Sequence, residues 1–351
     1  MFDIKDYDYN LPEELIVQVP LEDRDKSRLL VVDRSTGSIK DRRFMDLPEL
    51  LMPGDLLVVN NTRVVPARLF GRKESGGRID ILVLEHRNEE SALPETRWCL
   101  LRSSKRPKKG SRLFFEKDCS GIVESLGEDG LIQIAFKGPQ SIDSLLDAKG
   151  TMPLPTYIRR NAKNPLIELY RERYQTVFAK RRGAVAAPTA SLHFTSELLS
   201  KLEQAGIFVV PVTLHVGHGT FRPVRTRDIR DHQLGFEEYH LDADAAHAIE
   251  RSKQEGRRVI AVGTTVVRTL ESVVGAKGSM TSGKGKTDLL ITPGFSFRVV
   301  NAMITNFHLP RSSLLFLVSA FAGLELIRRA YQTAIAKAYR FYSYGDAMLI
   351  L

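Results

Sequence analysis

The stretch RRVIAVGTTVVRTLE, residues 257–271, combines the sequence features of a strand, a tight turn and a helix. Its apolar run at 258–262 has the length and β-branched content of a buried strand. Gly263 then permits a sharp bend, and Thr264 or Thr265 can cap the helix that follows. A buried strand that leads directly into a helix is the repeating unit of α/β sheets, so this stretch indicates the fold class.

Two further units of helix followed by strand lie upstream of this stretch. In the first, Thr195 can cap a helix and residues 207–214 form the apolar strand. In the second, Asp242 can cap a helix that ends at Gly256, just before the strand at 258–262. The first helix has an apolar face made of Leu198, Leu199, Leu202 and Ala205. Alternation of this kind favours an α/β sheet.

Between residues 62 and 150 the pattern changes to short, closely spaced β-type runs. The segments between the runs, such as Ser75-Gly76-Gly77 and Lys109-Gly110, are typical turn sequences. The runs are VVPARLFG (64–71), RIDILVLEH (78–86), TRWCLLRS (96–103), SRLFFEK (111–117), GIVESLG (121–127) and LIQIAFKG (131–138). Such a series predicts a small antiparallel barrel.

The predicted fold is therefore α/β, with a larger α/β domain formed by both chain ends and an inserted small antiparallel β-barrel domain. We expect the discontinuous α/β domain to span 1–62 and 150–351, and the six-stranded barrel-like insert to span 63–149. The segment 314–324 predicts a buried helix. A long final helix is expected to bury a stripe made of Leu324, Ile327, Tyr331, Ala334 and Ala338.

Composition limits the class of protein. The 351 residues are 43% apolar and 26% charged, which is typical of a globular chain. The longest nearly apolar stretch, 314–324, is shorter than the roughly 18 residues that cross a bilayer, and the first ten residues lack the features of a secretory signal. We therefore expect a cytoplasmic protein. Cys99 and Cys119 have no closely spaced partner and are interpreted as small apolar fillers.

A formal net charge of +9 favours a polyanionic partner, although many basic enzymes bind only small anions. Two groups of basic residues can follow the phosphates of a nucleic acid, and both are equally consistent with ordinary solvated surface. They are Arg102, Lys105, Arg106, Lys108 and Lys109 between two predicted barrel strands, and Arg181 with Arg182. Asn60, Thr62 and Arg63 lie where the barrel joins the sheet, and such a junction is a natural cleft.

GAVAAPTASLHFT, residues 183–195, places small residues directly before a predicted helix. The amide groups at a helix amino terminus suit a carboxylate, a phosphate or a developing anion, and His193 can exchange a proton there. Thr189 lies in the same loop. The alternative is a tightly packed turn with a structural histidine.

VTLHVGHGTFRPV, residues 212–224, leaves a predicted strand and enters a segment with Gly217 and Gly219. Ligands of open α/β sheets bind at the carboxyl ends of strands, so His215 is expected to face such a crevice. His215 and His218 have neither a helix to align them nor a convincing third ligand, and we predict no metal site.

The helix of the opening stretch offers a second candidate for ligand binding. Thr264, Thr265 and Glu271 can hold a nucleoside or a carboxylate, but a plain strand-to-helix connection with an exposed Glu271 fits equally well. GSMTSGKG, residues 278–285, has glycine where a phosphate loop requires serine or threonine, so it is interpreted as a flexible loop.

An ordered series of motifs covers nearly the whole chain. The series consists of LPEELI, SRLLVVD, GDLLVVNNTRVVPARLFG, MPLPTYI, YQTVFA, GAVAAPTASLHFT, VTLHVGHGTFRPV, VGTTVVRTLES, TDLLITPGF, TNFHLPRSSLL and RFYSYGDAMLI. Taken together, it resembles the S-adenosylmethionine:tRNA ribosyltransferase-isomerase family of queuosine biosynthesis. The ordered series is far more specific than any single loop.

The resemblance implies transfer and isomerisation of the ribosyl moiety of S-adenosylmethionine onto the aminomethyl group of 7-aminomethyl-7-deazaguanine, at the anticodon wobble position of tRNA. The product is epoxyqueuosine in tRNA, and adenine and methionine are released. S-adenosylmethionine is then a co-substrate, with no true cofactor and no metal. We expect no membrane partner and a monomeric chain.

This reaction requires a base near C5′ of the ribose and groups that stabilise charge. His193 is our first candidate for the base and His215 the second, whereas Asp346 can stabilise positive charge. The candidates for S-adenosylmethionine binding are Thr189, Gly217, Gly219, Thr264, Thr265 and Glu271. The candidates for contact with tRNA or its base are Asn60, Thr62 and Arg63 together with the two basic groups.

Two other functions fit parts of the sequence. A non-catalytic RNA-binding protein can use the barrel as its platform, but small and polar segments at several strand and helix ends favour a reaction site. An S-adenosylmethionine-dependent RNA methyltransferase uses the same sulfonium, but this chain lacks the expected glycine-rich loop after an early strand.

Overall fold

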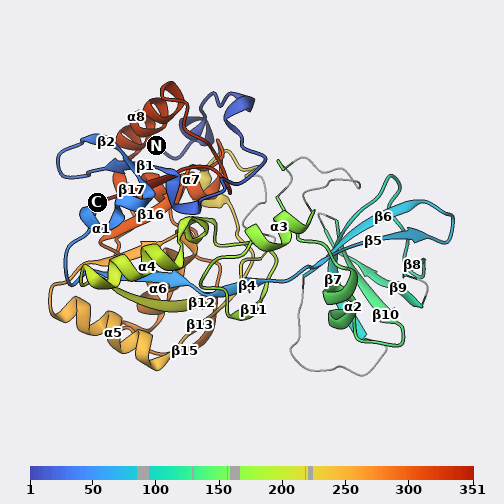
Figure 1. Ribbon diagram of the computed structural model, residues 1–351. Helices are drawn as coiled ribbons and strands as arrows, with labels where there is room; N and C mark the ends of the chain where they lie inside the picture. Colours follow the sequence, from blue (N-terminus) through green and yellow to red (C-terminus); the bar gives the residue numbers. More distant parts are fainter. Residues whose placement is uncertain are drawn as a thin grey trace.

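The computed structural model describes residues 1–84, 95–116, 118–128, 130–155, 157–158, 167–217, 219 and 224–351. These residues form a large mixed sheet covered by helices and, beside it, a closed six-stranded barrel (Figure 1). Both chain ends lie in the part that contains the large sheet (Figure 1). The predicted α/β class with an inserted antiparallel barrel is confirmed. The exact boundaries at residues 62 and 150 stay a prediction.

In the described part of the chain, the sheet has nine strands in the order β15, β13, β12, β3, β14, β16, β17, β1 and β2. Their bounds are β1 Arg28–Val32, β2 Ile39–Arg43, β3 Leu56–Asn60, β12 Phe208–Leu214, β13 Glu237–Leu241, β14 Val259–Val262, β15 Gly283–Thr287, β16 Ala302–Asn306 and β17 Ala347–Ile350. β12, β3, β14 and β16 are parallel, whereas β17 is antiparallel to β16 and parallel to β1. The carboxyl ends of the four parallel strands and the amino ends of β17 and β1 therefore share one edge of the sheet.

Helices cover both faces of the sheet because its central strands are apolar on both sides. On β3, Leu57 and Val59 belong to the same core as α1 (Leu47–Leu50) and α4 (Ser196–Gln204). Leu56 and Val58 face the opposite core. The helices that contribute to this second core are α5 Ala243–Gln254, α6 Thr264–Lys277, α7 Ser313–Ala322 and α8 Leu324–Ala336. No helix of the described residues is long and apolar enough to cross a membrane.

Local signals at the helix ends are partly confirmed. The Thr195 hydroxyl accepts a hydrogen bond from Leu198 N at 3.1 Å, as expected for a helix cap. Asp242 occupies the N-cap position of α5 but makes no capping bond, because its carboxylate contacts Arg181 instead. Gly263, with φ 93°, is the N-cap of α6, and neither Thr264 nor Thr265 caps that helix.

Two predictions for the C-terminal half of the chain are wrong. Ala338 does not extend the buried stripe of the final helix, because α8 ends at Ala336 and Ala338 adopts a left-handed φ of 49° and is exposed. Residues 278–285 are not only a loop, since Gly283–Thr287 forms the edge strand β15, which pairs with β13. In that strand a side chain at Gly285 would collide with the Tyr239 ring, so glycine is required by packing rather than by flexibility.

The barrel closes in the order β10, β7, β6, β5, β8 and β9. The strands are β5 Arg68–Lys73, β6 Arg78–Val83, β7 Glu95–Arg102, β8 Arg112–Glu116, β9 Cys119–Leu126 and β10 Leu131–Lys137. Helix α2 (Ile142–Lys149) contributes Ile142, Leu145 and Leu146 to the barrel core. Cys99 and Cys119 are buried in the same core, which agrees with their interpretation as small apolar fillers.

A short two-stranded connection links the barrel to the sheet. β4 (Thr62–Val64) pairs in parallel with β11 (Arg181–Ala184), and α3 (Ile167–Arg173) lies between the two parts (Figure 1). The predicted run 64–71 is thus divided between β4 and β5. Pro66 lies in the break, where it interrupts the strand because it lacks an N–H group.

Gly150 closes the barrel insert, and the chain has no room there for a side chain. A Cβ atom at this position would lie 1.9 Å from Pro66 O and 2.4 Å from Leu146 O. We predict that Gly150→Ala lowers the free energy of unfolding by about 1–3 kcal/mol, because backbone atoms must move to accept the methyl group. Urea unfolding of the two proteins measures this difference.

The matched control is Gly275→Ala in α6, where nothing lies within 4 Å of an added Cβ. That variant is expected to be as stable as the wild type or more stable by up to about 1 kcal/mol, because alanine is the better helix former. Equal stability of Gly150→Ala and wild type would contradict the account of the junction.

Candidate functional site

The site lies at the edge of the sheet where the parallel strands end. β3 ends at Asn60, β14 is followed by Gly263, and β16 ends at Asn306. The short helix η5 (Thr189–His193) contacts this edge, and a Cβ at Gly263 would lie 3.6 Å from Ala190 Cβ. The segment GAVAAPTASLHFT therefore lies beside the ends of these strands.

His193 is the central side chain of this edge. Its ring is 4% exposed and stacks on Phe44 with the ring centroids 4.9 Å apart. Its Nδ1 lies 2.7 Å from Ser27 Oγ and its Nε2 lies 3.2 Å from Asn306 Nδ2. Ser27 precedes β1 and Asn306 ends β16, so the imidazole bridges two strands of the sheet from above its edge.

The tautomer of His193 follows from its partners. Asn306 Nδ2 also donates to Tyr342 O at 3.1 Å, which fixes the orientation of the amide group. Since Nδ2 can only donate, Nε2 of His193 accepts and Nδ1 carries the proton that it donates to Ser27 Oγ. A neutral imidazole with its lone pair on Nε2 results.

The surroundings of His193 disfavour its charged form. Burial, together with the positive charges of Arg340 and Arg24, lowers the pKa of His193 to about 3. Burial and two guanidinium groups therefore keep the imidazole neutral near pH 7.

His215 lies at the end of β12 and belongs to a second, adjoining cluster. Its Nδ1 lies 2.8 Å from Thr62 Oγ1. Its ring packs on Gly183, where an added Cβ would lie 2.8 Å from the imidazole. Gly183 lies in β11 with a φ of 147°, which favours glycine. Because glycine has no side chain, the imidazole ring can pack directly on this backbone. His218 lies outside the described residues, so a pair of His215 with His218 is not placed.

Asn60 joins the ends of three elements. Its Nδ2 donates to Leu214 O at 2.9 Å and lies 3.3 Å from Thr265 Oγ1, and its Oδ1 accepts from Thr62 N and Leu214 N, each at 3.1 Å. The amide group thus holds β3, β12 and α6 together. Since its hydrogen-bonding groups are used in this way, Asn60 shapes the site more than it offers contacts to a ligand.

Asp346 is buried directly behind this edge. Its two carboxylate oxygens accept from Arg28 N at 2.9 Å and from Arg340 N at 2.8 Å. Burial raises its pKa, although those two amide bonds act in the opposite direction. Asp346 also lies 3.7 Å from Arg340 Nε, so it holds the position of that arginine.

Glu271 is not the exposed carboxylate that its place in the helix suggested. It is 2% exposed and accepts hydrogen bonds from Arg298 N, Val299 N and Val300 N at 2.9, 3.0 and 3.1 Å. These contacts fix the loop before β16. Glu271 therefore has backbone partners at both carboxylate oxygens.

The remaining candidates for S-adenosylmethionine binding are distributed along the same edge. Thr264 and Thr265 are each 7% exposed at the start of α6, and Thr189 begins η5. Gly217 N donates to Glu237 Oε1 at 2.8 Å, and Glu237 forms a buried ion pair with Arg268 of α6. A Cβ at Gly219 would lie 3.1 Å from Gly235 N, so this turn is tightly packed.

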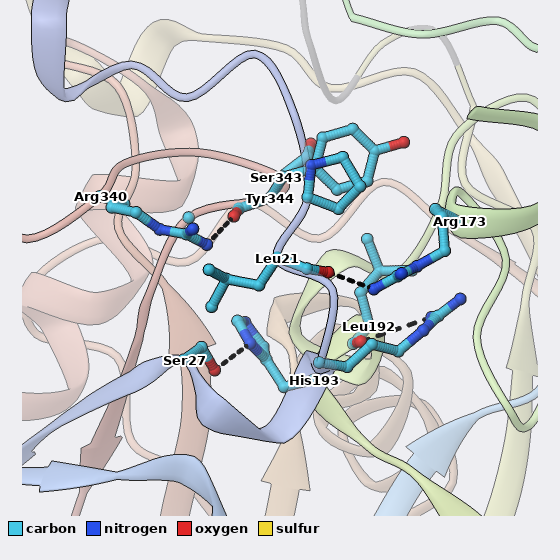
Figure 2. A pocket seen from close by; sticks show the side chains of 11 residues that line it. Leu21, Ser27, Arg173, Leu192, His193, Arg340, Ser343 and Tyr344 are labelled. Atoms are coloured by element: carbon cyan, nitrogen blue, oxygen red, sulfur yellow. Dashed lines mark hydrogen bonds between the residues drawn. The ribbon is translucent and has the colours of Figure 1, made fainter. Parts of the chain in front are cut away.

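A small cavity adjoins His193 and was not foreseen from the sequence (Figure 2). Its volume is about 20 Å³, enough for one water-sized group. The polar side chains that line it are Arg24, Ser27, Arg173, His193, Arg340, Ser343 and Tyr344. Three of these side chains are guanidinium groups. The motifs SRLLVVD, TNFHLPRSSLL and RFYSYGDAMLI contain Ser27, Asn306 and Arg340, respectively. Membership of these motifs was the feature of the sequence that could have indicated these three residues.

The basic groups lie away from this cavity. Arg181 contacts Asp242 at 2.8 Å and Arg182 contacts Asp147 of α2 at 2.6 Å, so both are tied to carboxylates. Arg106 donates to Gly127 O and Leu131 O, each at 2.7 Å, and braces a barrel turn. Arg63, Arg102, Lys105, Lys108 and Lys109 are exposed.

Comparison with known proteins gives a consistent result over the full chain. Residues 4–350 match the family model described as "Queuosine biosynthesis protein". The chain is 49% identical over 347 residues to the S-adenosylmethionine:tRNA ribosyltransferase-isomerase of Geobacter sulfurreducens, covering 99% of each chain. It is 50% identical over 351 residues to the enzyme of the same name from Carboxydothermus hydrogenoformans, again covering 99% of each.

A solved structure is similar as well. The crystal structure of S-adenosylmethionine tRNA ribosyltransferase from Thermotoga maritima aligns with a TM-score of 0.56 and 39% identity, covering 99% of this chain and 100% of that one.

The low pKa of His193 predicts an acid sensitivity that a variant can remove. The unfolded chain binds a proton near pH 6.5, whereas the folded protein does so only near pH 3, so stability falls as the pH drops through this window. Between pH 6.5 and pH 5 the free energy of unfolding falls in both proteins. We predict that it falls by about 1–2 kcal/mol less in His193→Asn than in the wild type. Urea unfolding at several pH values measures the two slopes.

His247→Asn on the exposed surface of α5 is the control and should keep the slope of the wild type. An unchanged slope in His193→Asn would show that the imidazole is not held neutral by the fold.

Proposed function

The chain belongs to the queuosine biosynthesis protein family and is a transferase, and from this premise we propose that it transfers the ribosyl moiety of S-adenosylmethionine to tRNA. The acceptor in this proposal is the aminomethyl group of 7-aminomethyl-7-deazaguanine at the anticodon wobble position. The product is epoxyqueuosine in tRNA, with adenine and methionine released. The observation that carries the proposal is the identity of about half the residues, over the full length, to enzymes named for this activity.

The sulfonium of the substrate makes the chemistry accessible to ordinary side chains. It acidifies the adjacent C5′ hydrogen, and removal of that proton lets the electron pair drive ring opening and departure of adenine, which takes up a proton. The amine of the tRNA base then adds to C4′ of the resulting vinyl sulfonium and loses a proton to solvent. The carbanion regenerated at C5′ attacks the aldehyde carbon C1′, which closes the carbocycle and leaves an alkoxide. The resulting alkoxide displaces methionine, whose sulfur keeps the electron pair of the broken C–S bond. The protein must supply a base, orient the substrate and exclude water.

His193 is our first candidate for the base in this proposal, and the lowering of its pKa to about 3 makes the free imidazole a weak one. The ring is neutral, buried and in the wall of a cavity, and its Nε2 lone pair is held by the weak donor contact to Asn306 at 3.2 Å. Exchange of that contact for the C5′ hydrogen places the proton on Nε2. Ser27 accepts from Nδ1 and keeps the ring oriented. His215 is the second candidate, supported by its place at the end of β12.

The nucleoside then lies along the strand ends outside the small cavity. Thr189, Thr264, Thr265, Gly217 and Gly219 line this edge and are our candidates for its contacts. Glu271, Asn60 and Asp346 support the edge from behind through their backbone partners. The target base must leave its stack to reach the site, and an anticodon loop allows this at a lower cost than a duplex does.

Product analysis tests the proposal. With tRNA that carries the aminomethyl deazaguanine, the enzyme is expected to release adenine and methionine from S-adenosylmethionine in equal amounts and to add a cyclopentane epoxide to the tRNA. The matched control is the same tRNA with guanine at the wobble position, which should give no adenine. Formation of S-adenosylhomocysteine and methylated RNA would instead identify a methyltransferase, and tRNA binding with neither product would identify an RNA-binding protein.

The exposed lysines of the barrel are our candidates for the tRNA backbone. We predict that the triple variant Lys105→Glu, Lys108→Glu and Lys109→Glu binds tRNA more weakly, because phosphate contacts release counterions. The plot of log Kd against log salt concentration should become shallower by up to about 3. Filter binding at several salt concentrations measures this slope.

Arg106 is left unchanged in this variant because it braces the barrel backbone. The control is a triple exchange to glutamate on the exposed surface at Lys201, Arg251 and Lys277 in α4, α5 and α6. An identical salt slope in the barrel variant and wild type would exclude the barrel lysines as a tRNA surface.

A further inference from the structure

Three arginines from distant parts of the chain converge on the cavity beside His193. Arg24 lies in the short helix η3 (Arg24–Lys26), Arg173 ends α3, and Arg340 lies between α8 and β17. Figure 2 shows Arg173 and Arg340 on opposite sides of the cavity, with His193 below them. The fold therefore gathers positive charge at a place that the sequence did not mark.

The partners of these guanidinium groups are mainly backbone carbonyls. Arg24 donates to Gln175 O at 2.7 Å, Arg173 donates to Glu22 O at 3.0 Å, and Arg340 donates to Tyr344 O at 2.6 Å. These bonds orient the three groups but do not neutralise them. The Nε atoms of Arg173 and Arg340 are buried and have no hydrogen-bond partner in the structure.

Carboxylates balance this charge only in part. Among the described residues, Arg340 forms an ion pair in which its Nε lies 3.7 Å from Asp346 Oδ1. Asp346 also accepts two backbone N–H groups. The negative charge of Glu172 raises the pKa of Arg24. Within the described part of the chain, the cavity wall thus holds three guanidinium groups and no carboxylate, and Asp346 lies behind Arg340.

The excess positive charge lowers the pKa values of neighbouring groups. Burial lowers the pKa of Arg24, and the charge of Arg173 lowers it further. The charges of Arg340 and Arg24 likewise lower the pKa of His193. Several like charges in a partly buried site are costly, and an anion placed between them removes that cost.

We propose that the cavity between Arg24, Arg173 and Arg340 binds the carboxylate of the methionyl group of S-adenosylmethionine. This inference rests on the proposed function, which supplies a substrate with one carboxylate. A guanidinium group matches the planar geometry of a carboxylate with two parallel hydrogen bonds. Because His193 lines the same cavity, a carboxylate anchored there holds the sulfonium and the ribose beside the imidazole.

Two kinds of anion can pair with these guanidinium groups: the carboxylate of S-adenosylmethionine and a phosphate of tRNA. We choose the carboxylate because the proposed site of proton removal, His193, lines the same cavity. The binding experiment below separates the two.

Binding of S-adenosylmethionine and of its decarboxylated analogue tests the proposal. Calorimetry gives Kd for both compounds with the full-length wild type and with Arg24→Gln and Arg173→Gln. We expect each variant to bind S-adenosylmethionine about 10- to 100-fold more weakly, as for loss of a hydrogen bond to a charged group. The wild type should discriminate against the analogue by a similar factor, and both variants should lose most of that discrimination. Arg251→Gln, exposed on α5, is the control and should behave as wild type.

Folding and tRNA binding are measured in parallel. Arg173 also holds Leu21 O at 2.5 Å, so thermal unfolding is followed for each variant, and Arg24→Lys, which keeps the charge, should recover part of the affinity. Equal discrimination against the analogue by wild type and variants would overturn the proposal. So would a loss of tRNA affinity with S-adenosylmethionine binding intact, because the cavity would then hold a phosphate. These results differ from failure of the proposed function, in which the wild type itself releases no adenine.

Discussion

The buried imidazole of His193, held neutral beside positive guanidinium groups, is the constraint on which the site depends. Its Nδ1–H donates to Ser27 ahead of β1, and its Nε2 accepts from Asn306 at the end of β16. The ring thereby ties η5 to strands on both sides of β17. Protonation would place a third positive charge beside Arg24 and Arg340 in a buried region, so these surroundings keep the Nε2 lone pair unprotonated and also make the ring a weak base.

Buried polar side chains stabilise this edge of the sheet, and their hydrogen-bonding groups are occupied mainly by backbone amides and carbonyls. Asn60 joins β3, β12 and α6, Glu271 holds three consecutive amides, and Asp346 holds the amides of Arg28 and Arg340. Each is buried, and each would leave unpaired backbone groups if it were removed. Their role is to position neighbours. The groups left for a ligand are the imidazole, the threonines of η5 and α6, and the three guanidinium groups of the cavity.

Local patterns predicted the architecture because strands, caps and turns are encoded by neighbouring residues. The alternating runs of the barrel and the cap at Thr195 are confirmed, and the final helix was misjudged only at its end, where Ala338 takes a left-handed backbone. The site was predicted less completely. Ser27 and His193 are 166 positions apart, and the chain forms the entire barrel between them. Arg24 and Arg173 gave no local signal, since only the closed fold brings them together.

The central claim is that His193 is neutral in the folded enzyme, with its proton on Nδ1. Nitrogen-15 NMR of protein labelled at histidine measures both properties directly, and His193→Asn identifies the resonances. The account predicts a protonated Nδ1 and an unprotonated Nε2 that do not titrate between pH 8 and pH 5.5. A ring that becomes doubly protonated near pH 6.5, or that carries its proton on Nε2, would contradict it.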